Sequence, residues 1–289
     1  MPWVNYKRGV ERAKKTPLTV SSNFAVLGSP IGHSLSPALH SAVITRLGID
    51  ATYDKFEVVE EQLPTFLELH SLWEGFSLTM PLKRAARQRV VSECSVSSLT
   101  GAVNTIVRRP EGWLGFNTDV WGAQQALSSQ LDTVGESGIL IGAGATAQSL
   151  LVALHGIGVT EFTFLVRDES RTTDLTEVAS RLGVTPRVER LGATVSADIV
   201  VNTLPSSAVL DDETIEGIDG SALFDVTYDP WPTVLATEWT ARGLPVVSGK
   251  WMLLWQALRQ SRLFYGGDVE DELPDESTIV TAMRSAVGL

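Results

Sequence analysis

The chain has 289 residues, of which 44% are hydrophobic and 20% charged, a composition and length that suit a globular protein of two domains of about 100–170 residues each. Its net charge of −11 argues against nucleic-acid binding, because phosphate contacts need clustered Lys and Arg, but leaves room for a local basic pocket that takes an anion. The single cysteine, Cys94, excludes an intramolecular disulfide and favours a cytoplasmic location, and the absence of an apolar stretch of about 18 residues predicts no membrane span.

The first residues, 1–22, are basic and are not followed by an apolar segment, so they do not have the pattern of a secretory signal. We expect a flexible tail here, with a transit peptide as the alternative.

Residues 23–120 alternate apolar runs with helical patterns, which predicts an α/β domain with mostly parallel strands. A helix is expected from Ser36, as N-cap, through Pro37 at the first helical position to about Arg46, with Gly48 ending it. The remaining elements are an amphipathic helix at 61–72 and strands at 24–27, 53–58, 76–79 and 102–107.

A second α/β series at 121–249 predicts a Rossmann-like, doubly wound dinucleotide-binding domain. Its expected helices and strands are 120–129, 138–141, 145–155, 162–166, 198–202, 223–226 and 245–247. Helical patterns at 250–264 and 277–287 predict that residues 250–289 return to the first domain, which would leave a cleft between a substrate domain and a nucleotide domain.

A glycine-rich turn between the strand 138–141 and the helix 145–155 has the G-x-G-x-x-A pattern of dinucleotide-binding proteins. Gly142 permits the tight turn, Gly144 lets backbone N–H groups approach a pyrophosphate, and Ala147 is small enough for helix–strand packing. The expected cofactor-binding residues of the turn are Gly142, Ala143, Gly144, Ala145, Thr146 and Ala147.

The end of the next strand should select NAD or NADP. Arg167 and Arg171 are suited to clamp a 2′-phosphate, whereas Asp168 and Glu169 favour a ribose hydroxyl. We expect NADP, with NAD as the alternative. The plainer interpretation is that this segment is only a solvated charged loop.

Lys83, on a Pro-containing turn, and Asp119, after a short extended segment, could exchange and stabilise protons near a substrate oxygen if the fold brings them together. Each also has a plainer interpretation: Lys83 as a surface lysine, and Asp119 as the N-cap of the helix at 120–129.

Three other polar side chains are candidate substrate ligands. Ser34 and Ser36, before a helix N-terminus, could bind a carboxylate, although Ser36 could be only a cap. Gln256 lies on a nearly apolar helix, so its amide needs a partner from the protein or from a polyhydroxy substrate. No metal site is expected, because His33 and His40 have no further Cys or His at ligand spacing.

Taken together, the ordered motifs resemble the shikimate dehydrogenase family over residues 24–289. The resemblance rests on P-I-x-H-S-x-S-P at 30–37, T-x-P-x-K at 79–83, G-A-V-N-T at 101–105, N-T-D-x-x-G at 117–122, the glycine turn, Y-x-P at 228–230 with Thr233, and G-x-x-M-L-x-x-Q at 249–256.

This resemblance implies NADPH-dependent reduction of 3-dehydroshikimate to shikimate in aromatic amino acid biosynthesis, with Lys83 and Asp119 as the catalytic pair. It also implies that the substrate is held by Ser34, Ser36, Thr79, Asn104 and Gln256, with Tyr228 near it. Thr203 and Gly249 would help to form the cofactor pocket.

Two positions depart from the family pattern. Ser77 stands where Asn is usual, so we expect a hydrogen bond there to be lost or bridged by water. Val166 and Asp168 replace the Asn and Thr beside the cofactor arginine, and Asp168 would repel a 2′-phosphate if it pointed inward. An NAD-dependent quinate/shikimate dehydrogenase and a non-catalytic sensor of these metabolites are therefore the alternatives, and the protein is expected to be a monomer or a homodimer.

Overall fold

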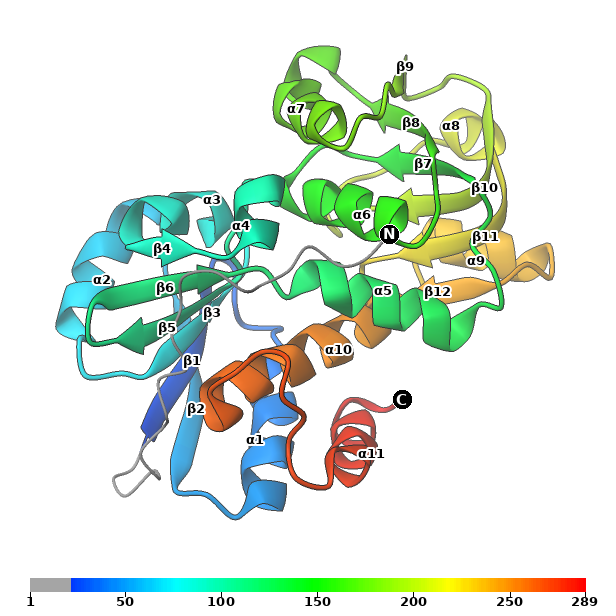
Figure 1. Ribbon diagram of the computed structural model, residues 1–289. Helices are drawn as coiled ribbons and strands as arrows, with labels where there is room; N and C mark the ends of the chain where they lie inside the picture. The colour runs from blue at the N-terminus through cyan, green and yellow to red at the C-terminus, as the bar shows by residue number, and fades with distance from the viewer. Residues whose placement is uncertain (1–21) are drawn as a thin grey trace. The chain divides into compact units, whose positions relative to one another are not determined.

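The structure is a computed structural model that describes residues 22–289, which form two compact units (Figure 1). Unit 1 contains residues 22–98, Ala102–Thr118 and Gln256–Leu289, and unit 2 contains Leu99–Gly101 and Asp119–Trp255. The flexible tail predicted at 1–22 lies outside the described residues apart from Ser22, which is buried in the first strand. Within residues 22–289 no helix has the length and apolar character needed to cross a membrane.

The sheet of unit 1 has six strands in the order β2-β1-β3-β5-β6-β4. Strand β5 alone runs against its neighbours, because β1 is parallel to β2 and β3, and β4 is parallel to β6. The strands are β1 (Ser22–Gly28), β2 (Ala51–Glu57), β3 (Gly75–Leu78), β4 (Ser92–Glu93), β5 (Thr105–Arg109) and β6 (Gly112–Phe116).

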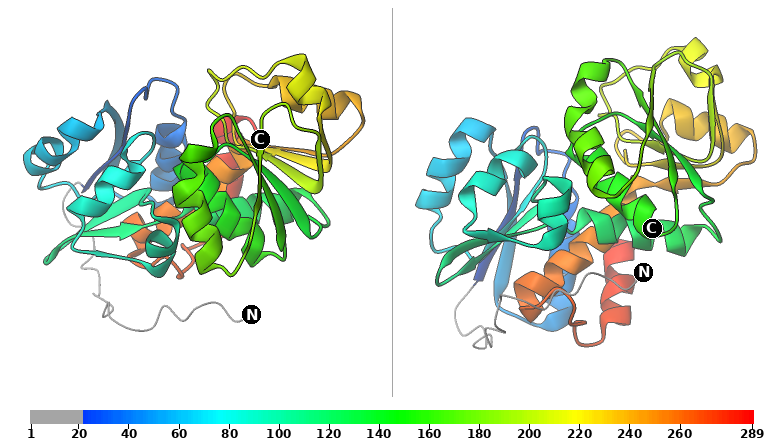
Figure 2. Two further views of the ribbon diagram at one scale, coloured as in Figure 1. Left: turned by 90° about the horizontal axis from the view of Figure 1, so that it is seen from above. Right: turned by 45° about the horizontal axis from the view of Figure 1, so that its top comes forward.

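Helices cover both faces of this sheet, and the orange helix α10 lies beside the blue helix α1 (Figure 2). The helices of this part are α1 (Ser36–Leu47), α2 (Leu63–Leu69), α3 (Leu82–Ala85), α4 (Ser95–Thr100) and α11 (Glu276–Val287), together with α10 (Gly249–Ser261) from Gln256 on. Short 3-10 turns occur at Glu60–Gln62 and Ala86–Arg89, and a π-helical turn, Arg262–Gly266, continues α10.

Alternation along β3 separates the two faces of the sheet, as successive strand side chains point to opposite sides. Phe76 and Leu78 join an apolar core with side chains of α2 and α3, including Leu63 and Leu82. Ser77 faces the other way, toward Tyr53 and helix α10. One face is therefore an ordinary hydrophobic core, and the other contains a buried polar group.

Unit 2 is a parallel sheet in the order β12-β11-β10-β7-β8-β9. Numbered from β7 and counted from the β9 edge, this is the order 3-2-1-4-5-6 of doubly wound dinucleotide-binding sheets, with its switch point between β7 and β10. The strands are β7 (Ser137–Ile141), β8 (Glu161–Val166), β9 (Arg187–Arg190), β10 (Val195–Asn202), β11 (Ile218–Asp225) and β12 (Val246–Ser248).

Figure 1 shows α5, α6 and α7 on one face of this sheet and α8 and α9 on the other. Fully buried Trp239 of α9 lies in the core of the second face, with Ile141 and Leu223. The helices are α5 (Asp119–Gln130), α6 (Ala145–Gly156), α7 (Thr173–Arg181), α8 (Asp212–Glu216) and α9 (Val234–Ala241), with a 3-10 turn at Glu169–Thr172.

Candidate active site

The carboxyl edge of the unit 1 sheet gathers most of the predicted substrate and catalytic residues. Strands β1 and β3 are parallel neighbours, and the loop that contains Ser34 follows β1 while Thr79 and Lys83 follow β3. Asn104 precedes antiparallel β5 and Asp119 follows β6, so the backbone of both lies at the same edge. In open α/β sheets, ligands bind just beyond the carboxyl ends of the strands, so this edge is the expected place for a ligand.

Backbone hydrogen bonds hold the two loops of this edge against each other. The Ser29 N–H donates to the Met80 carbonyl at 2.9 Å, and the Thr79 N–H donates to the Leu27 carbonyl at 2.9 Å. The Lys55 ammonium donates to the Gly32 carbonyl and fixes the turn before Ser34. These loops are thus positioned by their own backbone rather than by side-chain packing alone.

The prediction that Ser36 caps helix α1 is wrong. Ser36 is the first helical residue, Pro37 is the second, and Leu35 precedes them without a side-chain cap. The Ser34 hydroxyl instead accepts from the Ser36 N–H at 3.3 Å, because the Oγ two residues upstream reaches the first free N–H of the helix. Gly48, at φ 62°, ends the helix as predicted.

Asn104 connects the segments that carry Lys83 and Asp119. Its Oδ1 accepts from the Thr118 N–H at 2.9 Å, one residue before Asp119. The neighbouring Val103 N–H donates to the Lys83 carbonyl at 2.8 Å. Asn104 is 1% exposed and Asp119 is 4% exposed, whereas Lys83 is half-buried. Asp119 is the first residue of α5 rather than the residue before it.

Ser77, which stands where the family usually has Asn, makes two direct hydrogen bonds of its own in the structure. The Ser77 hydroxyl accepts from Tyr53 Oη at 2.7 Å and donates to Gln260 Oε1 at 2.8 Å. Gln260, which the sequence reasoning missed, lies one turn of α10 beyond the buried Gln256 and on the same face of the helix. A second glutamine four residues after Gln256, and so on the same face of the helix, was the signal that could have found it.

A candidate nucleotide site lies at the switch point of unit 2. The glycine turn follows β7, and Thr203 follows β10, the strand where the order reverses. Thr203 Oγ1 donates to the Ile141 carbonyl at 2.7 Å, so this side chain is part of the wall of the turn. Gly142 has φ 102°, and a Cβ there would lie 2.7 Å from Thr203 Oγ1.

The remaining glycines of this region differ in what surrounds them. Gly144 is the N-cap residue of α6, and a Cβ on it would meet nothing within 4 Å, so the space beside its Cα is open. That opening fits a pyrophosphate, which helix N-termini and bare backbone N–H groups bind well. A Cβ on Gly249 would collide with the Val226 backbone, so this glycine is required by the packing of α10 on the end of β11.

The loop after β8 carries the predicted phosphate ligands, and the end of β9 adds one residue that was missed. Arg167 and Arg171 are exposed, and the Asp168 carboxylate is turned onto its own loop, accepting from Ser170 N at 3.0 Å and Ser170 Oγ at 2.8 Å. These hydrogen bonds lower the pKa of Asp168. Arg190, paired with Val166 across β8 and β9, donates to Glu169 at 3.0 Å and adds a third arginine to this edge.

Tyr228 follows β11 in a loop that buried Asp225 holds. Asp225 Oδ2 accepts from Thr233 Oγ1 at 2.6 Å and from Asn202 Nδ2 at 3.1 Å, while Oδ1 accepts from the Thr227 N–H at 3.0 Å. Burial, with the charge of Asp229, raises the pKa of the Tyr228 phenol. The hydroxyl of Tyr228 is therefore a neutral hydrogen-bonding group at neutral pH.

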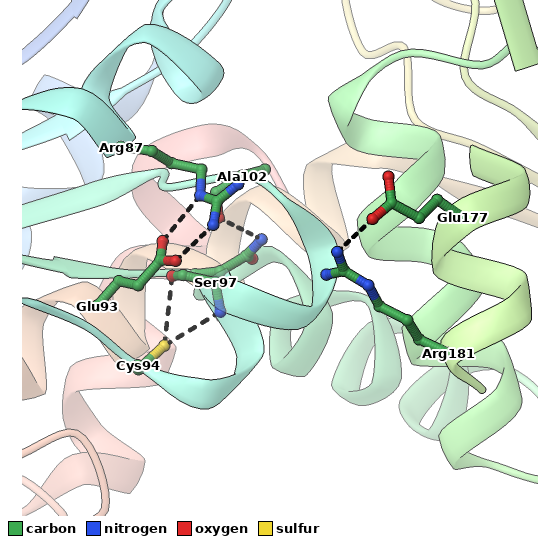
Figure 3. Close-up of polar contacts among 8 residues, drawn as sticks. Arg87, Glu93, Cys94, Ser97, Ala102, Glu177 and Arg181 are labelled. Atoms are coloured by element: carbon green, nitrogen blue, oxygen red, sulfur yellow. Dashed lines mark hydrogen bonds and ion pairs between the residues drawn. The ribbon is translucent and has the colours of Figure 1, made fainter. Parts of the chain in front are cut away.

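The segment that leads into α4 has its own polar contacts (Figure 3). Arg87 makes a two-pronged ion pair with Glu93, at 2.9 and 2.6 Å, and Cys94 Sγ accepts from the Ser97 N–H at 3.4 Å. These contacts tie β4 to the turn after Lys83. Over residues 22–289 no group of three or more His, Cys, Asp or Glu side chains is arranged to hold a metal ion.

One unit has a glycine turn at the switch point of a parallel sheet, and the other has polar loops at the carboxyl edge of its sheet; together these features define a two-unit α/β protein of the dinucleotide-binding class. A profile of the shikimate dehydrogenase substrate binding domain matches residues 26–106. The shikimate dehydrogenase (NADP(+)) of Methanosarcina acetivorans is 31% identical over 91% of this chain and 99% of its own.

Solved structures give the same result. The shikimate dehydrogenase of Mycobacterium tuberculosis superposes with a TM-score of 0.80 at 34% identity, over 91% of this chain and 99% of that one. The Thermus thermophilus enzyme, in complex with NADP(H) and shikimate, superposes with a TM-score of 0.76 at 31% identity, over 92% and 99%. The chain belongs to the shikimate dehydrogenase family.

Proposed function

We propose that this protein is an enzyme that reduces 3-dehydroshikimate to shikimate with NADPH, reversibly, in aromatic amino acid biosynthesis. The observation that carries the proposal is that relatives named shikimate dehydrogenase (NADP(+)) align over 91% of the chain, and so over both units. The carboxyl-edge loops of unit 1 and the glycine turn of unit 2 supply a polar site and a nucleotide site of the required chemistry.

In this proposal the substrate is held by hydroxyl and amide groups, most of them from unit 1. Ser34, with the helix N-terminus that it caps, suits the substrate carboxylate, since both offer hydrogen-bond donors to an anion. The other substrate ligands would be Ser36, Thr79, Asn104, Gln256 and Tyr228. A trihydroxy ring needs several such neutral partners, because each buried hydroxyl must be hydrogen-bonded.

Lys83 and Asp119 are the proposed catalytic pair. Hydride addition places negative charge on the carbonyl oxygen, and a lysine ammonium stabilises that charge and donates the proton. Asp119 would orient the Lys83 ammonium and bind a substrate hydroxyl. Because the carboxylate is 4% exposed, its orientation is restricted by the surrounding protein.

NADPH, when bound, supplies the hydride. The residues proposed to hold it are the turn Gly142–Ala147, whose N–H groups and open space in front of Gly144 suit a pyrophosphate, together with Thr203 and the Gly249 backbone. Arg167 and Arg171 would bind the 2′-phosphate. The Asp168 carboxylate is held on its own loop by Ser170 and remains charged, so its distance from the bound phosphate decides how strongly it opposes this.

The test is the initial rate of nicotinamide absorbance change with shikimate, comparing NADP with NAD and shikimate with quinate. We expect oxidation of shikimate with a preference for NADP. Lys83→Ala should lower kcat by about 10²–10⁴-fold with a smaller effect on the KM for shikimate, because general acid–base help acts in the transition state.

The neighbouring Arg84→Ala, one residue along α3, is the matched control for loss of positive charge and should keep most of the turnover. Equal turnover of quinate, or a preference for NAD, would overturn the biosynthetic assignment. Tight binding of shikimate without any hydride transfer would overturn the enzyme.

A further inference from the structure

Gln260 is a buried amide whose contacts lie on the polar face of the unit 1 sheet. It is 1% exposed, and its Oε1 accepts from Ser77 Oγ at 2.8 Å. Its Nε2 donates to Thr105 Oγ1 at 3.0 Å and makes a longer contact, 3.4 Å, with the Asn104 carbonyl. The amide therefore bridges β3 and the start of β5.

The orientation of this amide is fixed by its neighbours. His40 Nε2 lies 3.3 Å from Gln260 Oε1, and His40 Nδ1 lies 3.1 Å from Tyr265 Oη. Because Oε1 can only accept, His40 must carry its proton on Nε2 and Ser77 must direct its proton to Gln260. Ser77 can do so since its lone pair already accepts from Tyr53. Every polar atom of the Gln260 amide is thereby used.

From Gln260 the hydrogen bonds continue to the proposed substrate residue. Thr105 Oγ1, which accepts from Gln260, donates to Asn104 Oδ1 at 2.8 Å. The same Oδ1 accepts from Thr118 N–H, so the Asn104 carboxamide is held from two sides. The Asn104 carboxamide is held in one orientation, because Thr105 and Thr118 both donate to its Oδ1.

We propose that Gln260 is a positioning residue: it orients the Asn104 carboxamide through Thr105, and occupies with Ser77 a space that a longer side chain at position 77 could fill alone. Asn104 in turn holds Thr118, one residue before Asp119, so the same amide sets where the active-site segment begins. The part of the proposal that concerns substrate rests on the proposed function.

The geometry predicts that Ser77→Asn is destabilising in the wild type and stabilising in Gln260→Ala. Ser77 and Thr105 are directly opposed residues of β3 and β5, so side chains at these positions are within reach of each other. In the wild type, Ser77→Asn places a larger group where Gln260 lies 2.8 Å from Ser77 Oγ, and should lower the melting temperature and raise the KM for shikimate. In Gln260→Ala the same asparagine has room and can donate to Thr105.

The experiment measures KM for shikimate, KM for NADP, kcat and Tm for the wild type, Ser77→Asn, Gln260→Ala, the double variant and Gln260→Met. We expect Gln260→Met and Gln260→Ala to raise the KM for shikimate by roughly tenfold, as for loss of about 1.4 kcal/mol of binding, with an unchanged KM for NADP. The double variant should recover both Tm and KM relative to Gln260→Ala.

Gln124→Met is the matched control, because Gln124 is another buried glutamine, 5% exposed, in α5 of unit 2, and donates to the Ala153 carbonyl at 3.1 Å. It should leave the KM for shikimate unchanged. Suppose that Gln260→Met lowers Tm but keeps the KM for shikimate within twofold of wild type. Gln260 would then contribute to stability alone, and the proposal would be overturned. A double variant no better than Gln260→Ala would also overturn it.

These outcomes are separate from a failure of the proposed function. If the wild type does not oxidise shikimate, the proposed function fails, while the four Tm values of the Ser77 and Gln260 cycle still report the coupling of the two side chains. Additive changes in Tm would then overturn the shared-space arrangement.

Discussion

His40 shows how burial converts a titratable group into a neutral hydrogen-bonding one. Its ring is fully buried, stacks on Tyr53 with ring centroids 3.9 Å apart, and is bonded at both nitrogens. Burial lowers the pKa of His40 to about 3, against a small opposing effect of the hydrogen bond to Gln260. His40, one of the two histidines considered for metal binding in the sequence, is therefore a buried structural residue.

This pKa predicts acid sensitivity. Between about pH 6.5 and 3 the unfolded state binds a proton at His40 and the folded state does not, so folding stability should rise with pH across this window. The slope from this one group is at most about 1.4 kcal/mol for each pH unit.

Urea unfolding from pH 7 to 4.5 checks this expectation, with His40→Gln losing most of the slope. The aspartates whose pKa is lowered, Asp168, Asp198 and Asp211, lose their stabilising contribution mainly below their ordinary value of 3.8, so most of their effect lies below this range. An unchanged slope in His40→Gln would contradict the assignment.

Residue types and spacing singled out Lys83, Asp119 and the glycine turn, whereas Asn104 and Thr203 were expected only from the family resemblance. Lys83, Asn104 and Thr203 occur at strand ends, where topology gathers them. Pairings across long sequence separation were not predictable. Nothing local to Ser77 indicates that Gln260, 183 residues later, fills the space beside it.

Among the elements, strands with a continuous apolar run were predicted within a few residues. The run 24–27 became β1 (Ser22–Gly28), and 162–166 became β8 (Glu161–Val166). Strands without such a run were missed. β9 (Arg187–Arg190) is a charged edge strand, and β6 (Gly112–Phe116) contains two glycines, so neither has the apolar pattern of a buried strand.

Helix ends were less predictable because they depend on contacts outside the helix. The helix expected at 61–72 ends at Leu69, where His70 Nδ1 lies 2.8 Å from the Phe66 carbonyl and Leu69 and Leu72 are exposed. The helix expected to run to Phe264 instead widens into the π-helical turn at Arg262. Apolar periodicity sets the face of a helix but not its final turn.

The glycine turn gives a paired prediction. Gly142→Ala should lower Tm by several degrees, because its φ of 102° and the contact with Thr203 both strain an added Cβ, and left-handed strain costs on the order of 1–3 kcal/mol. Gly144→Ala has an ordinary φ of −78° and open space, so its Tm without ligand should hardly change.

Thermal melts and NADP titrations separate the two variants. Gly144→Ala should weaken NADP binding although the apoprotein is as stable as wild type, because the methyl group occupies the opening proposed for the pyrophosphate. Unaltered NADP affinity in Gly144→Ala would mean that the cofactor does not approach the turn there.

At the scale of the whole molecule, the two units differ in how the chain builds them. The core of unit 2, which includes Ile139, Val200 and Trp239, comes from one stretch of chain, Asp119–Trp255. Unit 1 needs segments from both ends: Phe264 packs on Phe24 with ring centroids 4.9 Å apart, and Gln260 bonds to Ser77. Apolar patterning could predict each core, but it could not predict that unit 1 depends on residues 256–289.

We therefore expect the fragment 119–255 to unfold cooperatively on heating, and the fragment 1–118 to lack a cooperative transition. The first retains its full set of core contacts, while the second exposes the face on which Phe24 and His40 pack. Circular dichroism melts of the two fragments provide the measurement. Addition of a peptide spanning 256–289 to fragment 1–118 should restore a transition; cooperative melting of 1–118 alone would contradict the expectation.

The discontinuity of unit 1 also bears on how the protein is made. A nascent chain that has released Trp255 from the ribosome already holds every residue of the second unit, whereas the first still lacks Gln256–Leu289. At synthesis rates of about 5–20 residues per second, the apolar side chains on the α10-facing side of β1 stay uncovered until translation is almost complete. The part synthesised first therefore cannot complete its fold until residues 256–289 have been made.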